Sequence, residues 1–151
     1  MKFETKLSLL IGANGKTPTQ YAALCLRRRA GKQEVLLITS RDSGRWVLPK
    51  GWPIAGLGAS GSAAREAWEE AGVIGTVSDT CLGHFSYEKT LGTAIARPCR
   101  VAVYPLSVDR LADEFPEMGQ RKRKWFTPSK AATKVLEPEL AQLLAELPAK
   151  L

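Results

Sequence analysis

One segment near the middle of the chain, residues 60–71, has the composition of an α-helix and follows a glycine-rich stretch at 51–61. It is dense in alanine and glutamate, which favour helices, and Ser60 or Ser62 is suited to cap its first turn. Gly72 stands where a left-handed cap ends many helices. The sequence therefore predicts a helix from Ser60 to Ala71, around which the rest of the fold must pack.

Apolar runs of strand length lie on both sides of this helix. We expect strands at 21–27, 34–39 and 45–48 before it, the first two forming a hairpin, and strand-like runs at 73–87, 94–106 and 122–126 after it. Residues 109–118 are expected to form a loop or a short helix. Thr127-Pro128 and Glu137-Pro138 suit the starts of two final helices, and an apolar stripe marks the second, at Leu140, Leu143, Leu144 and Leu147. This order predicts an α/β fold with helices on the faces of a mixed sheet.

The chain has 151 residues and a net charge of +7, from 22 Lys and Arg against 15 Asp and Glu. This length suits one domain, which we expect at 19–151 after an N-terminal segment at 1–18. The positive charge favours a phosphate-bearing partner without naming it.

The sequence shows no sign of membrane insertion or secretion. No apolar run reaches the about 20 residues of a membrane helix, residues 1–11 lack a secretory pattern, and three cysteines cannot all pair. We expect a cytoplasmic protein with reduced thiols and no membrane partner, and leave its oligomeric state open.

Three carboxylates gather on the predicted helix. Glu66, Glu69 and Glu70 are spaced so that they share one side of it. Like charges this close repel each other, and a bound cation would reverse the sign of that interaction. Oxygen ligands without Cys or His suit Mg²⁺ or Mn²⁺. The same string also occurs on solvated helix faces, so the spacing alone leaves both interpretations open.

The residues around this cluster complete a longer pattern. Gly51 followed by Arg65-Glu66-Ala67-Trp68-Glu69-Glu70-Ala71-Gly72-Val73 resembles the Nudix box over residues 51–73, with one departure, since Leu57 stands in place of the first glutamate of that pattern. Residues 21–75 and 119–126 resemble the diphosphoinositol polyphosphate phosphohydrolase branch of the family, which also hydrolyses dinucleoside polyphosphates. The resemblance implies a Nudix-type α/β/α sandwich with a mixed central sheet. It also implies metal-dependent hydrolysis of a diphosphate bond by water.

The resemblance also implies roles for single residues. The backbone carbonyl of Lys50 and the carboxylates of Glu66 and Glu70 are expected to hold Mg²⁺, with Mn²⁺ as the alternative, and Glu69 to activate the water. Four cations near this edge are expected to contact substrate, namely Arg41, Arg45, Lys50 and Arg123. Three residues are expected to support the site, namely Gly51, Arg65 and Gly72, with Arg65 holding one glutamate in place. The aromatic side chains are assigned to packing, including Trp46, Trp125, Tyr21, Phe85 and Tyr87.

Two departures from this branch bear on the substrate, which is expected to be a small phosphorylated molecule. Eukaryotic members carry a basic run where this chain has residues 18–21, and a Lys-Pro pair where it has Glu137-Pro138. Both departures remove positive charge that would meet a highly phosphorylated inositol. We therefore rank a dinucleoside polyphosphate ahead of a diphosphoinositol polyphosphate, and ADP-ribose and similar conjugates behind both.

Two interpretations from other classes compete with an enzyme. A basic nucleic-acid-binding module would use residues 27–29 and 121–124, but the chain has no recognised motif for reading nucleic acid, so nucleic acid is not the expected partner. A Nudix-fold domain that binds ligand without turnover would not need all of Glu66, Glu69 and Glu70, so the presence of all three argues against this interpretation.

Overall fold

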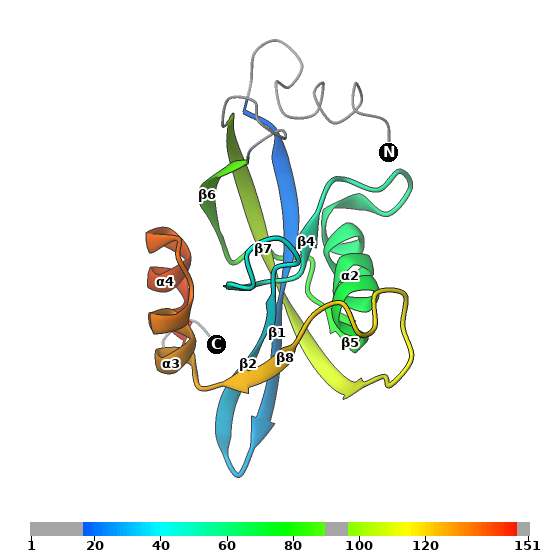
Figure 1. Ribbon diagram of the computed structural model, residues 1–151, viewed down its shortest axis with the longest axis vertical. Coiled ribbons are helices and arrows are strands. Elements are labelled where there is room, and N and C mark those ends of the chain that lie inside the picture. The colour runs from blue at the N-terminus through cyan, green and yellow to red at the C-terminus, as the bar shows by residue number, and fades with distance from the viewer. Residues whose placement is uncertain (1–16, 90–96, 148–151) are drawn as a thin grey trace.

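The computed structural model describes residues 17–89 and 97–147, which fold around one sheet (Figure 1). The strands are β1 (Thr19–Arg29), β2 (Lys32–Thr39), β3 (Trp46–Val47), β4 (Lys50–Gly51), β5 (Val73–Val77), β6 (Gly83–Lys89), β7 (Arg97–Leu111) and β8 (Arg123–Phe126). The helices are α2 (Gly58–Ala71), α3 (Pro128–Lys134) and α4 (Pro138–Ala145). The predicted N-terminal segment falls outside the described residues as far as residue 16, as do residues 94–96 of the predicted strand.

Strand β1 lies at the centre of the sheet and sets its topology. The main path runs β3-β2-β1-β7-β5, while β4 pairs with β1, β6 with β7 and β8 with β2. β1 and β7 are parallel, with Thr19 beside Arg100 and Leu26 beside Ser107. The other pairs are antiparallel. The prediction of an α/β fold with a mixed sheet is confirmed.

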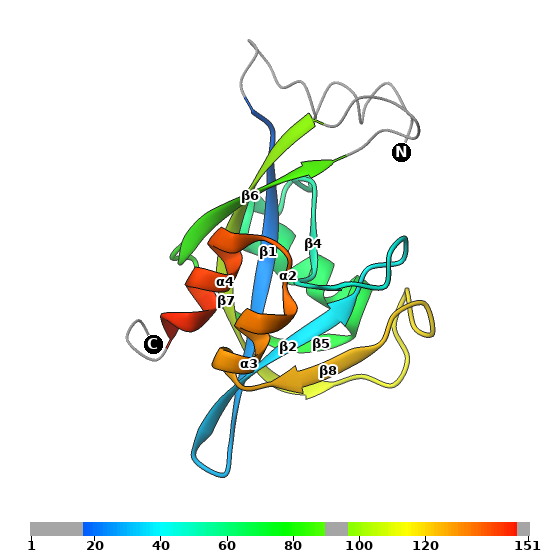
Figure 2. The same cartoon turned by 60° about the vertical axis from the view of Figure 1, so that its left-hand side comes forward.

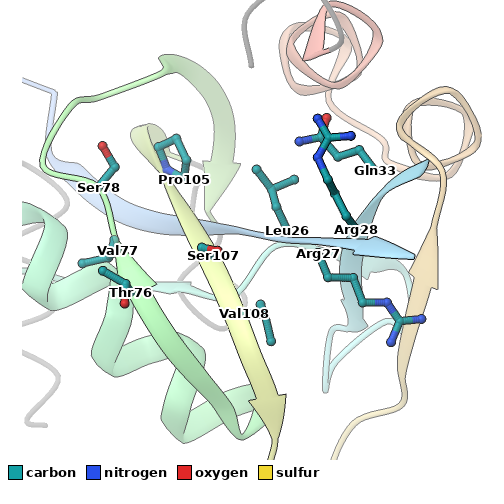
Figure 3. A pocket seen from close by; sticks show the side chains of 10 residues that line it. All are labelled: Leu26, Arg27, Arg28, Gln33, Thr76, Val77, Ser78, Pro105, Ser107 and Val108. Carbon is teal, nitrogen blue, oxygen red and sulfur yellow. The ribbon is translucent and has the colours of Figure 1, made fainter. Parts of the chain in front are cut away.

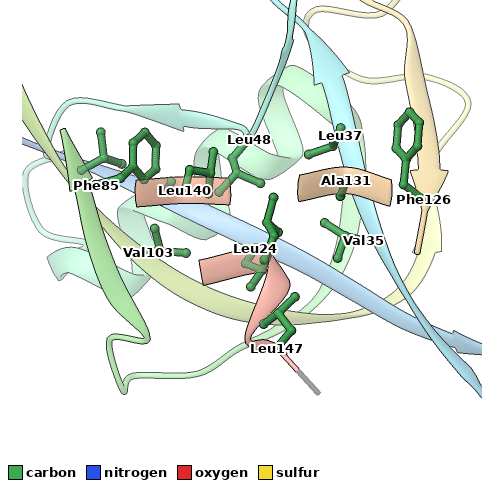
Figure 4. Close-up of a cluster of buried hydrophobic side chains, with 13 residues drawn as sticks. Leu24, Val35, Leu37, Leu48, Phe85, Val103, Phe126, Ala131, Leu140 and Leu147 are labelled. Carbon is green, nitrogen blue, oxygen red and sulfur yellow. The ribbon is translucent and has the colours of Figure 1, made fainter. Parts of the chain in front are cut away.

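Helices cover both faces of this sheet, so the fold is an α/β/α sandwich (Figures 1 and 2). α2 packs on one face through Ala63, Ala67 and Ala71, which are fully buried. Small side chains let this helix lie close to the strands. α3 and α4 cover the other face through a larger apolar cluster (Figure 4), in which the predicted stripe supplies three buried leucines, Leu140, Leu144 and Leu147.

The boundaries of α2 are partly as predicted. Gly72 ends the helix with a φ of 67°, and its N–H bonds the carbonyls of Ala67 and Trp68, which confirms the left-handed cap. The helix begins at Gly58 rather than Ser60, and neither serine caps it. Ser62 instead donates to the Gly58 carbonyl and accepts from the N–H of Ile54, so its hydroxyl fixes the loop that precedes the helix.

The strands also differ from the prediction in extent. The hairpin is confirmed, but β1 runs to Arg29 because the left-handed residues Ala30 and Gly31 form its turn. The predicted run 73–87 is broken by a connection at 78–82, and β7 continues to Leu111, into the segment expected to be a loop. Pairing with β5 supports this extension. Among the described residues, no helix is both long and apolar enough to cross a membrane.

Candidate active site

A cavity of about 410 Å³ lies where β4 meets the side of α2. Its lining includes the carboxylates of Glu66, Glu70 and Glu117, and three cations, Arg41, Lys50 and Arg121. Gln20 and Tyr87 also line it. The fold therefore brings the two predicted metal-binding glutamates into one cavity with two of the four predicted substrate contacts.

The contact between β4 and α2 depends on Gly51. A β-carbon at this position would overlap the Glu66 carboxylate, lying 2.6 Å from its Oε2. One residue earlier, the backbone N–H of Lys50 donates to Oε1 of Glu70 at 3.3 Å. β4 is itself held by β1, where Gly51 lies beside Tyr21. A glycine here lets the strand run directly against the helix carboxylates, and the role of the Lys50 carbonyl as a metal ligand stays a prediction.

Burial and mutual repulsion act on the two glutamates. Burial, together with the charges of Glu70, Glu69 and Glu117, raises the pKa of Glu66 to about 8. The pKa of Glu70 is raised to about 7, mainly by burial and against the opposing charges of Arg121 and Lys50. Both raised pKa values show that it is unfavourable for Glu66 and Glu70 to be ionised together at this point. A cation between the carboxylates would relieve this cost.

The donor set fits a hard divalent cation. Oxygen ligands are available from Glu66, Glu70 and the adjacent backbone, and Mg²⁺ commonly takes one or two carboxylates and completes its shell with water and substrate phosphate. Within residues 17–89 and 97–147, no group of three or more His, Cys, Asp or Glu side chains is arranged to hold a metal ion. The two carboxylates would therefore supply only part of the ligands of a cation.

The predicted base, Glu69, lies beside the cavity rather than in its lining. Its charge contributes to the raised pKa of Glu66, so the two carboxyl groups are near each other. Its backbone carbonyl accepts a hydrogen bond from the N–H of Glu117 at 3.0 Å. This bond ties the loop between β7 and β8 to the helix, and the role of Glu69 as base stays a prediction.

The sequence predicts no role for Glu117, and in the basic run it predicts Arg123 rather than Arg121 as a substrate contact. The Arg121 side chain is only 10% exposed, donates to Oε1 of Glu117 at 3.1 Å and lies 3.8 Å from Oε2 of Glu70. It also donates to the carbonyl of Thr39 at 3.2 Å. The i,i+4 spacing of Glu117 and Arg121 is visible in the sequence, but it indicates a contact only in a helix, and the segment expected to be a loop or a short helix ends at residue 118.

The cavity lining does not include Arg123, Arg45 or Arg65. Arg123 donates to the carbonyl of Ala71 at 2.8 Å and so braces the C-terminal end of α2. Arg45 pairs with Glu137 at 2.9 Å. Neither arginine lines the cavity. Arg65 is exposed, and the described residues contain no ion pair between it and a glutamate, because Glu66 and Glu70 face β4 instead.

Tyr87 belongs to the wall of the cavity as well as to the core. Phe85 is buried as expected, whereas Tyr87 is half-buried and lines the site. Its hydroxyl donates to Gln20, and Nζ of Lys50 lies 5.0 Å from the centre of its ring. Tyr87 packs against the core cluster as predicted, but the prediction is incomplete, because strand alternation fixes a face of the sheet and does not fix whether a helix covers it.

A second cavity, of about 560 Å³, lies where β1 and β7 diverge (Figure 3). It is lined by Arg27 and Arg28 with hydroxyl and apolar groups, and it contains none of the α2 carboxylates. Arg27 is already bound to Glu34 at 2.8 Å and stacked 4.1 Å from the Trp125 ring. The chemistry of diphosphate hydrolysis therefore points to the smaller cavity.

Comparisons with known proteins show the family and the fold to which this chain is similar. The family model described as "NUDIX domain" matches residues 18–147. Human diphosphoinositol polyphosphate phosphohydrolase 3-beta is 34% identical over 131 residues, which cover 83% of this chain and 75% of that protein. Arabidopsis thaliana Nudix hydrolase 16, mitochondrial, is 33% identical over 116 residues, 75% of this chain and 64% of that one. The crystal structure of a C. elegans Ap4A hydrolase superposes with a TM-score of 0.66 at 23% identity, covering 87% of this chain and 96% of that one.

Proposed function

The chain belongs to the Nudix family of hydrolases, and we propose that it hydrolyses a phosphoanhydride bond of a dinucleoside polyphosphate in the cavity beside β4. The observation that carries this proposal is the position of Glu66 and Glu70, which lie against Gly51 and the Lys50 backbone in the same cavity as Arg41 and Arg121. Carboxylates for a cation and cations for phosphates thus meet in one place.

Each group has a distinct task in this proposal. Glu66, Glu70 and the Lys50 carbonyl would hold Mg²⁺, or Mn²⁺ as the alternative. When bound there, the metal supplies neutralisation of the phosphate oxygens and a lowered pKa for water. Glu69 takes the proton of the attacking water as general base. The side chains of Arg41 and Lys50 hold the phosphate chain and stabilise the charge that develops on the leaving phosphate.

The choice of substrate rests on the two departures from the diphosphoinositol branch, at residues 18–21 and at Glu137-Pro138, where positive charge that would meet a highly phosphorylated inositol is missing. In the cavity, Tyr87 and Gln20 bond to each other, and the Lys50 ammonium lies over the Tyr87 ring. A diphosphoinositol polyphosphate remains the second candidate, since the human relative named above is a diphosphoinositol polyphosphate phosphohydrolase.

We also propose a cytoplasmic location, supported by the three free cysteines.

The test is Mg²⁺-dependent release of nucleotide from a panel of phosphoanhydrides. We expect diadenosine tetraphosphate to be hydrolysed. Glu69→Gln should lower kcat by about 100-fold or more, the usual scale of acid–base catalysis, and Glu70→Gln should lower it by a comparable factor because it removes a metal ligand. Glu114→Gln is the matched control, because Glu114 is exposed and lies outside the cavity lining. Unchanged turnover in both site variants would show that the site is placed wrongly.

A further inference from the structure

Trp52 lines the candidate active site without belonging to the core. It follows β4 directly, is half-buried, and forms part of the cavity wall together with Pro53 and Ile54. Trp46 and Trp125 each pack against one of the two buried apolar clusters. Among the described residues, Trp52 belongs to neither cluster. Core packing therefore does not account for an indole at this position.

The ring of Trp52 also differs from these two indoles in its partners. Trp46 packs edge to face with Phe126, with ring centres 5.2 Å apart, and the Arg27 guanidinium lies 4.1 Å from the centre of the Trp125 ring. Within residues 17–89 and 97–147, no aromatic ring or cation is stacked on Trp52. An indole in a cavity wall whose face is open suits a flat ligand group, and nucleobases stack on such side chains.

The loop that carries Trp52 is fixed on both sides of this residue. Before it, Gly51 pairs with Tyr21 of the central strand β1. After it, the N–H of Ile54 donates to Oγ of Ser62 on α2 at 2.9 Å. A side chain that is already held in place loses less conformational freedom when a ligand binds it, which favours affinity.

The apolar wall and the charged groups belong to the same cavity of about 410 Å³. Gly51, the residue before Trp52, lies directly against the Glu66 carboxylate. Glu70, Lys50 and Arg121 line the same cavity. This combination suits a ligand that has a phosphate part for the charged groups and a flat, apolar part for the wall at 52–54.

We propose that Trp52 is a specificity-determining residue that stacks on a nucleobase of the substrate. A nucleoside polyphosphate has both a phosphate chain and a flat base, whereas a fully phosphorylated inositol carries phosphate on every ring carbon and has no flat face to stack. Because stacking tolerates any base, Trp52 selects for a nucleoside without fixing which one. The inference rests on the proposed function for the identity of the site, and it names the part of the substrate that Trp52 recognises.

The test separates binding of the base from binding of the phosphates. Isothermal titration in the presence of Mg²⁺ uses two probes without a phosphoanhydride bond, α,β-methylene adenosine diphosphate and methylenediphosphonate, which lacks the nucleoside. Trp52→Ala should bind the nucleotide probe about tenfold more weakly, the scale of one base stack, and methylenediphosphonate as tightly as the wild type. Equal weakening of both probes would mean that the phosphate site was disturbed, and would overturn the inference.

Two further variants serve as controls for this titration. Trp52→Phe keeps an aromatic face and should keep most of the affinity for the nucleotide probe. Leu57→Ala removes an exposed apolar side chain from the same loop, outside the cavity lining, and should leave both affinities unchanged. A loss in Trp52→Phe as large as in Trp52→Ala, or an equal loss in Leu57→Ala, contradicts a role in stacking.

Tryptophan fluorescence reports where the base binds, because stacking of a base on an indole quenches its emission. The nucleotide probe should quench the wild type and Trp68→Phe alike, since Trp68 is half-buried on α2 and lies outside the cavity lining. The quenching should be largely lost in Trp52→Phe, although the probe still binds. Quenching that persists in Trp52→Phe would place the base elsewhere and overturn the inference.

Kinetics extend the test to the substrates themselves. In Trp52→Ala, KM for diadenosine tetraphosphate should rise while kcat stays nearly the same, the pattern of an interaction present both before and during the reaction. If diadenosine tetraphosphate is hydrolysed but Trp52→Ala matches the wild type in KM and in nucleotide affinity, the inference fails and the proposed reaction stands. If Trp52→Ala selectively loses the nucleotide probe while no variant hydrolyses any phosphoanhydride, the inference stands and the proposed reaction is wrong.

Discussion

Replacing Gly51 with alanine tests whether the site depends on the close approach of β4 to α2. The added β-carbon would lie 2.5 Å from Oε1 of Glu66, where ordinary contact begins at 3.4 Å, so the carboxylate must move by about 0.9 Å. The obstacle is the flexible end of a side chain and not backbone, so the free energy of unfolding should fall by about 1 kcal/mol, the low end for overpacking. Turnover should fall far more, by about 100-fold, since a 1 Å misplacement costs this much in catalysis.

The assay measures kcat for diadenosine tetraphosphate and the Mg²⁺ concentration at half-maximal rate, with urea unfolding as the stability readout. Gly61→Ala is the matched control, because its β-carbon would meet only the side chain of Leu57 at 3.2 Å and alanine favours a helix. Shortening the obstructing side chain, in Gly51→Ala/Glu66→Asp, should recover part of the Mg²⁺ response. A folded Gly51→Ala protein with wild-type kcat and Mg²⁺ dependence would refute the reasoning.

Three further changes test the surroundings of the site. Arg121→Gln removes the guanidinium that lies beside Glu70 and Glu117, and we expect the free energy of unfolding to fall by about 2 kcal/mol in urea; an unchanged value would contradict this role of Arg121. Gly72→Ala forces a left-handed φ of 67° on alanine and places its β-carbon 2.9 Å from Cγ of Phe115, so the free energy of unfolding should fall by about 1–3 kcal/mol. The double variant Gly72→Ala/Phe115→Ala removes the steric contact, and its loss of stability should be smaller than the sum of the losses of the two single variants. Addition of Mg²⁺ should stabilise the wild type, by about 2.7 kcal/mol at a concentration 100 times its Kd, and this should appear as a higher melting temperature. The melting temperature of Glu66→Gln/Glu70→Gln should not rise. Chelation of the Mg²⁺ should reverse the rise in the wild type.

The sequence determined what depends on neighbours along the chain. Helical spacing placed Glu66 and Glu70 on one side of α2, and the tolerance of glycine for a left-handed φ ended that helix at Gly72. Apolar runs of strand length predicted the β1–β2 hairpin, and helical spacing predicted the leucine stripe at the C-terminal helix; the structure confirms both. These features follow from backbone geometry that repeats every few residues.

Only the tertiary structure decided which charged groups meet. Arg45 and Glu137 lie 92 positions apart in the chain and form a buried pair, whereas Arg123 turns to the end of α2 and Arg121 takes the place beside Glu70. A cation's partner depends on the register and twist that bring distant segments together, and on which buried carboxylate lacks a counter-charge. Residue type and spacing show neither how distant segments are aligned nor which carboxylate needs a counter-charge. The sequence therefore predicted the carboxylates of the candidate site but not the cations that pair with them.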